Sequence, residues 1–117
     1  MCIRDRGKKE VNILSVEYLE DEERICLSSE NEIVKGSYIL HIKFKSDITD
    51  DLKGFYKSKY LTKENEEKWI ATTQFEPTSA RNAFPCWDEP EYKAVFSITI
   101  IADKKLLRVS NEKVLEV

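Results

Sequence analysis

A glutamine and a glutamate two positions apart, Gln74 and Glu76, are the residues best suited to bind a ligand. They end an alternating segment, and side chains two positions apart on a strand leave the same face of a sheet. Pro77 follows at once and cannot donate to a ladder, so the strand should end there. An amide and a carboxylate held by rigid neighbours could bind a cationic or peptide-like ligand. The alternative is a solvated carboxylate beside a glutamine that satisfies a loop carbonyl.

A second group of charged residues follows shortly after this pair, and we interpret it as structural. Arg81 is expected to bridge the acids of the next turn, Asp88 and Glu89. Pro90 is expected to fix the exit from that turn because its ring restricts the backbone. These residues are therefore not predicted to be catalytic.

The remaining reactive side chains indicate no catalytic or metal site. Cys86 is expected to be a buried small hydrophobe, since no adjacent base argues for a nucleophile. Trp87 is expected to pack against the protein rather than to stack on a ligand. His41 is the single histidine, so a His-Glu-x-x-His zinc helix is excluded within this chain. The three cysteines form no C-x-x-C pair, so neither a disulfide framework nor a structural zinc site is expected.

The elements that must position these residues are β-strands, because period-two patterning dominates the chain. The clearest alternation is found in residues 37–45, 68–76 and 92–101. Weaker strands are predicted at residues 12–19, 24–28, 55–60 and 106–110. Residues 77–83 indicate one helical turn, because Pro77 suits a first helical position. We therefore predict an all-β fold, an antiparallel sheet or sandwich with one short helical turn near residues 77–83.

Composition and charge exclude several classes of protein. The formal net charge is −3 with both signs interspersed and no basic stripe, so a nucleic-acid partner is not expected. No apolar run approaches the roughly 20 residues of a membrane span. Residues 1–6 match no element pattern, so we expect residues 1–9 to be a non-native or disordered leader. Residues 10–117 are then expected to be a partial β domain, since the last residues look like the start of another strand.

The run from Ala71 to Pro90 resembles the N-terminal domain of the gluzincin zinc aminopeptidases, the family of aminopeptidase N and the puromycin-sensitive aminopeptidase. In that family a Thr-Gln-Phe-Glu-x-x-x-Ala-Arg-x-x-Phe-Pro-Cys-[Phe/Trp]-Asp-Glu-Pro signature precedes a strand similar to residues 92–100. Three further segments resemble the family in the expected order, at residues 36–44, 51–60 and 109–111. The resemblance covers roughly residues 11–111, and Glu112 departs from the common Met-Pro after Asn111.

The resemblance implies a saddle-like β domain and a role for two residues. The glutamate matching Glu76 binds the free α-amino group of the substrate, and the glutamine matching Gln74 forms a hydrogen bond near its first residue. The zinc ligands, the general base and the oxyanion-stabilising tyrosine belong to the next domain of such enzymes, so no cofactor is expected in this chain and no catalysis from it alone. The implied partners are the N-terminus of a peptide and the catalytic domain of the same chain.

Other interpretations stay open at this stage. One is a relative that has lost its zinc and serves as a scaffold or interaction domain, although such a protein would not need both Gln74 and Glu76. Another is a free-standing β-sandwich binding module. The leukotriene hydrolase branch is disfavoured, because relatives of that type have glutamine at the position of Glu76. Trp87 in place of phenylalanine leans toward the cytosolic, puromycin-sensitive branch, and a membrane-anchored enzyme is the alternative.

Overall fold

The computed structural model describes residues 2–5 and 10–115. Strands are the main regular elements in these residues, and the helical segments are two short 3-10 turns. All strand pairs in the sheets are antiparallel, which confirms the predicted all-β class. The predicted helical turn is confirmed as η2 (Ala80–Asn82), which begins three residues after Pro77 rather than at it.

Two hairpins follow the predicted alternating segments closely. β3 (Ile13–Leu19) and β4 (Arg24–Ser29) are joined by the acidic 3-10 turn η1 (Glu20–Glu22). β6 (Gly54–Leu61) and β7 (Glu67–Gln74) pair without interruption, from Gly54 opposite Gln74 to Leu61 opposite Glu67. Because both partners of each hairpin are close in sequence, their pairing costs little loop-closure entropy.

The third sheet joins distant parts of the chain in the order β2-β1-β5, where β1 is Cys2–Asp5, β2 is Glu10–Val11 and β5 is Tyr38–His41. β5 is shorter than the predicted strand at residues 37–45. β1 forms in a segment where the sequence indicated no element. The expectation of a leader at residues 1–9 falls partly on residues 1 and 6–9, which lie outside the described residues, and its non-native origin stays a prediction.

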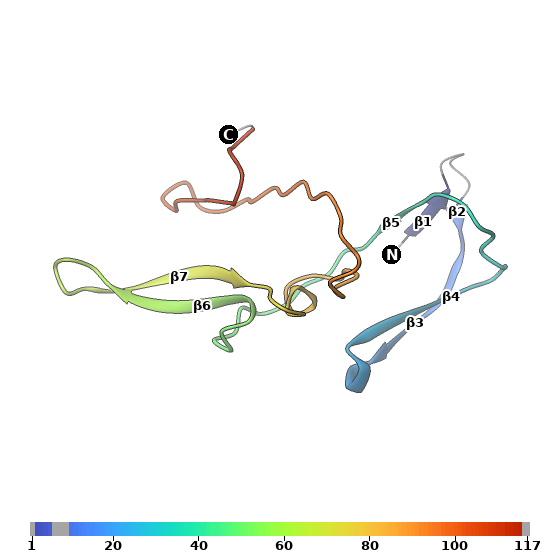
Figure 1. The fold of residues 1–117 in the computed structure, drawn as a ribbon, viewed down its shortest axis with the longest axis horizontal. Helices are drawn as coiled ribbons and strands as arrows, with labels where there is room; N and C mark the ends of the chain where they lie inside the picture. The colour runs from blue at the N-terminus through green and yellow to red at the C-terminus, as the bar shows by residue number, and fades with distance from the viewer. Residues whose placement is uncertain (1, 6–9, 116–117) are drawn as a thin grey trace.

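Two predicted strands are wrong for the described structure, residues 92–101 and 106–110. Neither is assigned to a strand, and Figure 1 draws them as an extended trace that turns back on itself. Val95 is fully exposed and Ile101 is 94% exposed. Alternation predicts a strand only where a ladder partner exists, because a strand is defined by its pairing. The described residues supply no partner for either segment.

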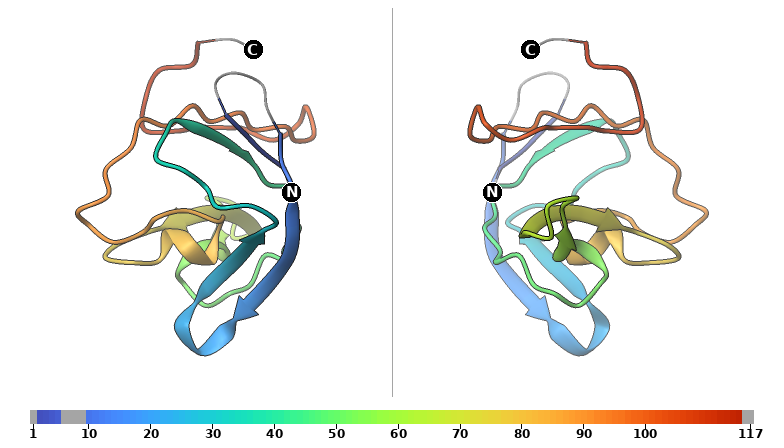
Figure 2. Two further views of the ribbon diagram at one scale, coloured as in Figure 1. Left: turned by 90° about the vertical axis from the view of Figure 1, so that its right-hand side faces the viewer. Right: turned by 90° about the vertical axis from the view of Figure 1, so that its left-hand side faces the viewer.

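The described chain is elongated, with principal extents of 61 × 36 × 26 Å. In Figure 1 the β6–β7 hairpin lies at one end, the other five strands lie at the opposite end, and η2 lies between them. Figure 2 looks along the long axis and shows the β3–β4 hairpin and the β6–β7 hairpin as separate elements. Gly54 is the one buried residue among residues 10–115. The central region around Gly54 and η2 is therefore the best-packed part of the fold.

Candidate functional site

The predicted binding pair lies where the β6–β7 hairpin meets the central loop. Gln74 is the last residue of β7, and its ladder partner is Gly54. Glu76 lies two residues beyond the strand, and its peptide bond to Pro77 is cis. Both residues are exposed. Neither side chain has a hydrogen-bond or ion-pair partner within residues 2–5 and 10–115, so both are available to a ligand.

Gly54 lets the start of β6 lie directly against η2. Its φ is +67°, and a Cβ at this position would lie 2.7 Å from Asn82 Cβ and 3.0 Å from the Asn82 carbonyl carbon. Only glycine adopts this conformation without steric cost, and only glycine leaves room for Asn82. Sequence reasoning missed this residue as part of the site. The signal was a glycine at the beginning of a predicted strand, where a close backbone approach is common.

Arg81, in η2, binds the turn that follows it, as the sequence predicted. Its backbone N–H and its side-chain Nε both donate to Asp88 Oδ2, at 2.9 and 3.0 Å. Its Nη2 lies 3.9 Å from Glu89 Oε1. The side chain of Asp88 is only 9% exposed and that of Arg81 is 21% exposed, so this ion pair is partly shielded from solvent. The hydrogen bond to Asp88 is the main cause that raises the pKa of Arg81.

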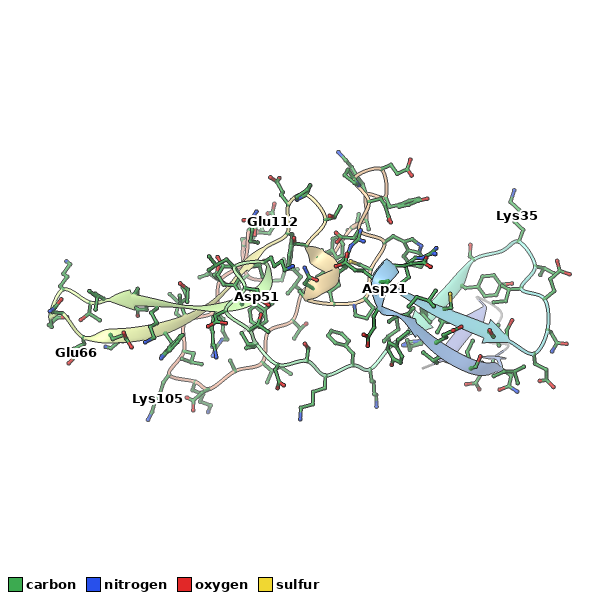
Figure 3. The ribbon with its side chains drawn as sticks, turned by 90° about the horizontal axis from the view of Figure 1, so that it is seen from below. Asp21, Lys35, Asp51, Glu66, Lys105 and Glu112 are labelled. Atoms are coloured by element: carbon green, nitrogen blue, oxygen red, sulfur yellow. The ribbon has the colours of Figure 1, made fainter. Side chains whose placement is uncertain are left out.

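A third carboxylate reaches Arg81 from a distant hairpin. Arg81 Nη1 donates to Glu23 Oε2 at 3.3 Å, across 58 positions of sequence. Glu23 follows η1 in the left-handed region, with a φ of +51°. Figure 3 labels Asp21 in this same turn, and its ribbon lies beside the η2 segment at the centre of the molecule. Nothing in the sequence signalled this contact, because it depends on how two separate elements meet in space.

Two aromatic contacts hold the loop between β7 and residue 96. Phe84 meets Phe75 edge-on, with ring centroids 5.8 Å apart, and meets Phe96 at 6.0 Å. Such edge-to-face pairs contribute roughly 0.5–1.5 kcal/mol beyond their buried area. Phe75 stands between Gln74 and Glu76, so this contact lies at the base of the candidate site.

The other two residues singled out in this loop behave differently from one another. Cys86 is half-buried, in keeping with a small packing residue, and burial is the first cause that raises the pKa of its thiol. The prediction that Trp87 packs is wrong, since its side chain is 72% exposed. The reason is that the contacts of this loop are made by Arg81, Phe84 and Asp88, none of which covers the indole.

The potential metal ligands of residues 2–5 and 10–115 do not gather at one place. No cluster of three or more His, Cys, Asp or Glu side chains able to hold a metal occurs there. His41 lies in β5 and is exposed. The residues present therefore do not fit a zinc site. Within the same residues, no helix is long and apolar enough to cross a membrane.

The chain is similar to one family model and to several aminopeptidases. Residues 2–117 match the family model described as the Peptidase M1 N-terminal domain. Aminopeptidase 2, mitochondrial, of Saccharomyces cerevisiae is 51% identical over 78 residues, which are 66% of this chain and 8% of that protein. Endoplasmic reticulum aminopeptidase 1 of Homo sapiens is 44% identical over 96 residues, 82% of this chain and 10% of that protein. Puromycin-sensitive aminopeptidase of Caenorhabditis elegans is 47% identical over 76 residues, 65% of this chain and 8% of that protein.

The matched region is a small part of each relative. The chain spans about a tenth of the length of the curated relatives it matches, from 8% to 11%. The similarity therefore bears on one domain and leaves the rest of those proteins outside the comparison.

Proposed function

This chain belongs to the M1 peptidase family, whose N-terminal domain it matches over residues 2–117, and on that premise we propose that it anchors the substrate of a zinc aminopeptidase. The Glu76 carboxylate accepts hydrogen bonds from the α-ammonium group of a peptide. The Gln74 amide binds near the first residue of the same peptide. Together they select a free N-terminus over an internal peptide bond.

The observation that carries this proposal is the state of the three acids in residues 73–90. Asp88 and Glu89 are both engaged with Arg81. Glu76 is exposed and has no ion-pair partner in the part of the chain that the structure describes. An ammonium group has three donors and requires acceptors, and a charged hydrogen bond contributes roughly 1.5–3 kcal/mol. Glu76 is the acid of this segment that can supply such a bond.

We propose that another domain of the same protein catalyses hydrolysis of the peptide bond. Zinc would supply there a Lewis acid and an activated water. The role proposed for Gln74 and Glu76 is to hold and orient the amine end of the peptide, and no group able to hold a metal occurs among the described residues. We accordingly expect the isolated 117-residue chain to have no peptidase activity. Its partners are the peptide N-terminus and the catalytic domain.

The proposal is tested by replacing Glu76 with Ala or Gln in the full-length protein and measuring kcat/KM on peptides with a free N-terminus. We expect a loss of about 2–5 kcal/mol in transition-state stabilisation if the ion pair is desolvated. Glu91→Gln is the matched control, because Glu91 is another exposed acid without a partner among the described residues. An unchanged kcat/KM in the Glu76 variants would contradict the anchoring role of Glu76.

A separate assay of the 117-residue chain tests whether catalysis requires another domain. The 117-residue chain, assayed alone with added zinc, is expected to release no N-terminal residue. Reproducible zinc-dependent release by this chain would contradict that expectation. A full-length protein that binds no zinc but still carries this domain would instead favour a scaffold or interaction role.

For the compartment we propose the cytoplasm, from the similarity of Trp87 to the puromycin-sensitive branch. The names of two other relatives refer to the mitochondrion and the endoplasmic reticulum, so the compartment varies among similar proteins. Imaging of a tagged full-length protein tests the proposal, and co-localisation with either organelle would overturn it.

A further inference from the structure

We propose that Arg81, through Asp88, is the positioning residue that fixes Glu76 for the substrate amine. The inference rests on the proposed function and extends it to a residue that does not contact the substrate. Arg81 is five positions from Glu76, and its guanidinium is directed to carboxylates other than Glu76.

The loop that carries Glu76 is closed by three successive contacts. The Ser79 backbone N–H donates to the Phe75 carbonyl oxygen at 2.8 Å. The Phe75 and Phe84 rings meet edge-on at 5.8 Å. Arg81 then donates twice to one oxygen of Asp88, which ties the beginning of η2 to the far side of the loop. Glu76 lies within the first two of these contacts, and the Arg81–Asp88 contact fixes η2, which follows directly after Ser79 and precedes Phe84.

η2 is itself fixed against the sheet. Gly54 meets Asn82, the residue after Arg81, and Gly54 pairs with Gln74 across the hairpin. Arg81 Nη1 also binds Glu23 from the β3–β4 turn. Arg81 thus links the loop, the hairpin that carries Gln74 and a distant turn. The placement of Gln74 relative to Glu76 depends on the same cluster.

The positive charge of Arg81 allows a positioning role to be distinguished from a purely electrostatic one. If Arg81 acted only as a nearby positive charge, its removal would strengthen binding of an ammonium ion, because like charges repel. Removal of the Asp88 charge would weaken binding, since it leaves an unbalanced guanidinium. A positioning role predicts instead that both changes weaken binding, because each opens the loop. The two explanations therefore predict opposite signs for Arg81→Ala.

The experiment uses the full-length protein and two small probes in calorimetric titrations. One probe is an amino acid amide with a free α-amine, and the other is the same amide without the amine. We expect Arg81→Ala to lower the affinity for the amine probe by about tenfold, because the contact to the amine is displaced. The affinity for the other probe should change by less than about twofold. Asp88→Asn should have a similar effect. Arg81→Lys should recover part of the affinity, because it keeps one charged donor.

A double variant and a control complete the test. Adding Arg81→Ala to Glu76→Gln should cause no further loss of amine affinity, because both act on one contact. Glu91→Gln is the control, since Glu91 is an exposed acid without a partner among the described residues. Tighter amine binding in Arg81→Ala, or equal weakening of both probes, would overturn the positioning role. If Arg81→Ala does not fold, Arg81→Lys replaces it: this variant keeps the positive charge, so a charge-only role predicts unchanged amine affinity, whereas the positioning role predicts a loss.

Different outcomes would contradict the anchoring function of Glu76 and the positioning role of Arg81. If Glu76→Gln leaves amine affinity unchanged, the anchoring function itself is wrong. If Glu76→Gln weakens the amine probe while Arg81→Ala and Asp88→Asn do not, only the positioning role is wrong.

Discussion

At Gly54 the backbone combines three demands that no other described residue meets together. It starts β6, pairs with Gln74 and lies against Asn82 with a φ of +67°. A side chain here would be strained by the backbone and would collide with a neighbour that cannot easily move, since one of the close atoms belongs to the Asn82 backbone. The geometry of the candidate site therefore depends on glycine at position 54 as well as on Gln74 and Glu76.

Gly54→Ala is expected to lower the free energy of unfolding by about 1–3 kcal/mol, from left-handed strain and overpacking. Urea unfolding of the full-length protein, followed through the transition of this domain, measures the change. Gly36→Ala is the control: Gly36 has no positive φ, and its new Cβ would meet only the Tyr38 ring, at 3.3 Å. A Gly54→Ala midpoint equal to that of Gly36→Ala would contradict the close approach as a determinant of stability.

Among the structural elements, the sequence predicts strands whose partners are close in sequence, but it does not predict contacts between distant parts of the chain. The strands of the hairpins β3–β4 and β6–β7 were predicted because alternation within a short span specifies each of them. Residues 92–101 alternate equally well, yet they have no ladder partner among the described residues. The same limit holds in the site. The Arg81–Asp88 pair was predicted from neighbouring charges, whereas the Glu23 contact spans 58 positions and required the fold.

The β6–β7 hairpin carries a cross-strand cluster whose contribution is expected to be small. Lys59 Nζ lies 4.9 Å from the centroid of the Trp69 ring and 2.6 Å from Glu67 Oε1, with half of each charged side chain exposed. Exposed cation–π contacts contribute about 0.5–1 kcal/mol and surface ion pairs about 0–1 kcal/mol. Solvent screening keeps the sum near the lower values.

Lys59→Ala is accordingly expected to cost less than about 1 kcal/mol in urea unfolding, with the cost shrinking at high salt. Lys57→Ala is the matched control. Lys57 lies farther from the same ring, at 5.7 Å, and has no ion pair in the described part of the chain. A salt-independent loss of several kcal/mol in Lys59→Ala would show that the cluster is shielded from solvent.

For the whole molecule, the balance between exposed and buried apolar surface is unusual. The radius of gyration is 18.0 Å, against about 13 Å for a compact domain of this length. Large apolar side chains such as Val95, Ile101 and Leu107 are 88% exposed or more. Exposed apolar surface of this amount is typical of an interaction site. In the proposed protein, other parts of the domain and the catalytic domain would cover it.

The isolated chain is therefore expected to be marginally stable. Folding must offset about 1–2 kcal/mol of backbone entropy per ordered residue, and apolar burial is the main term that does so. With one buried residue among residues 10–115, that term is too small to hold the hairpins of the isolated chain in a fixed arrangement. We expect the 117-residue chain to bind a hydrophobic dye and to lose its signal gradually on heating, while the full-length protein shows a cooperative transition and binds little dye. A sharp melt of the isolated chain well above roughly 60 °C, near the upper end for ordinary domains, would contradict this expectation.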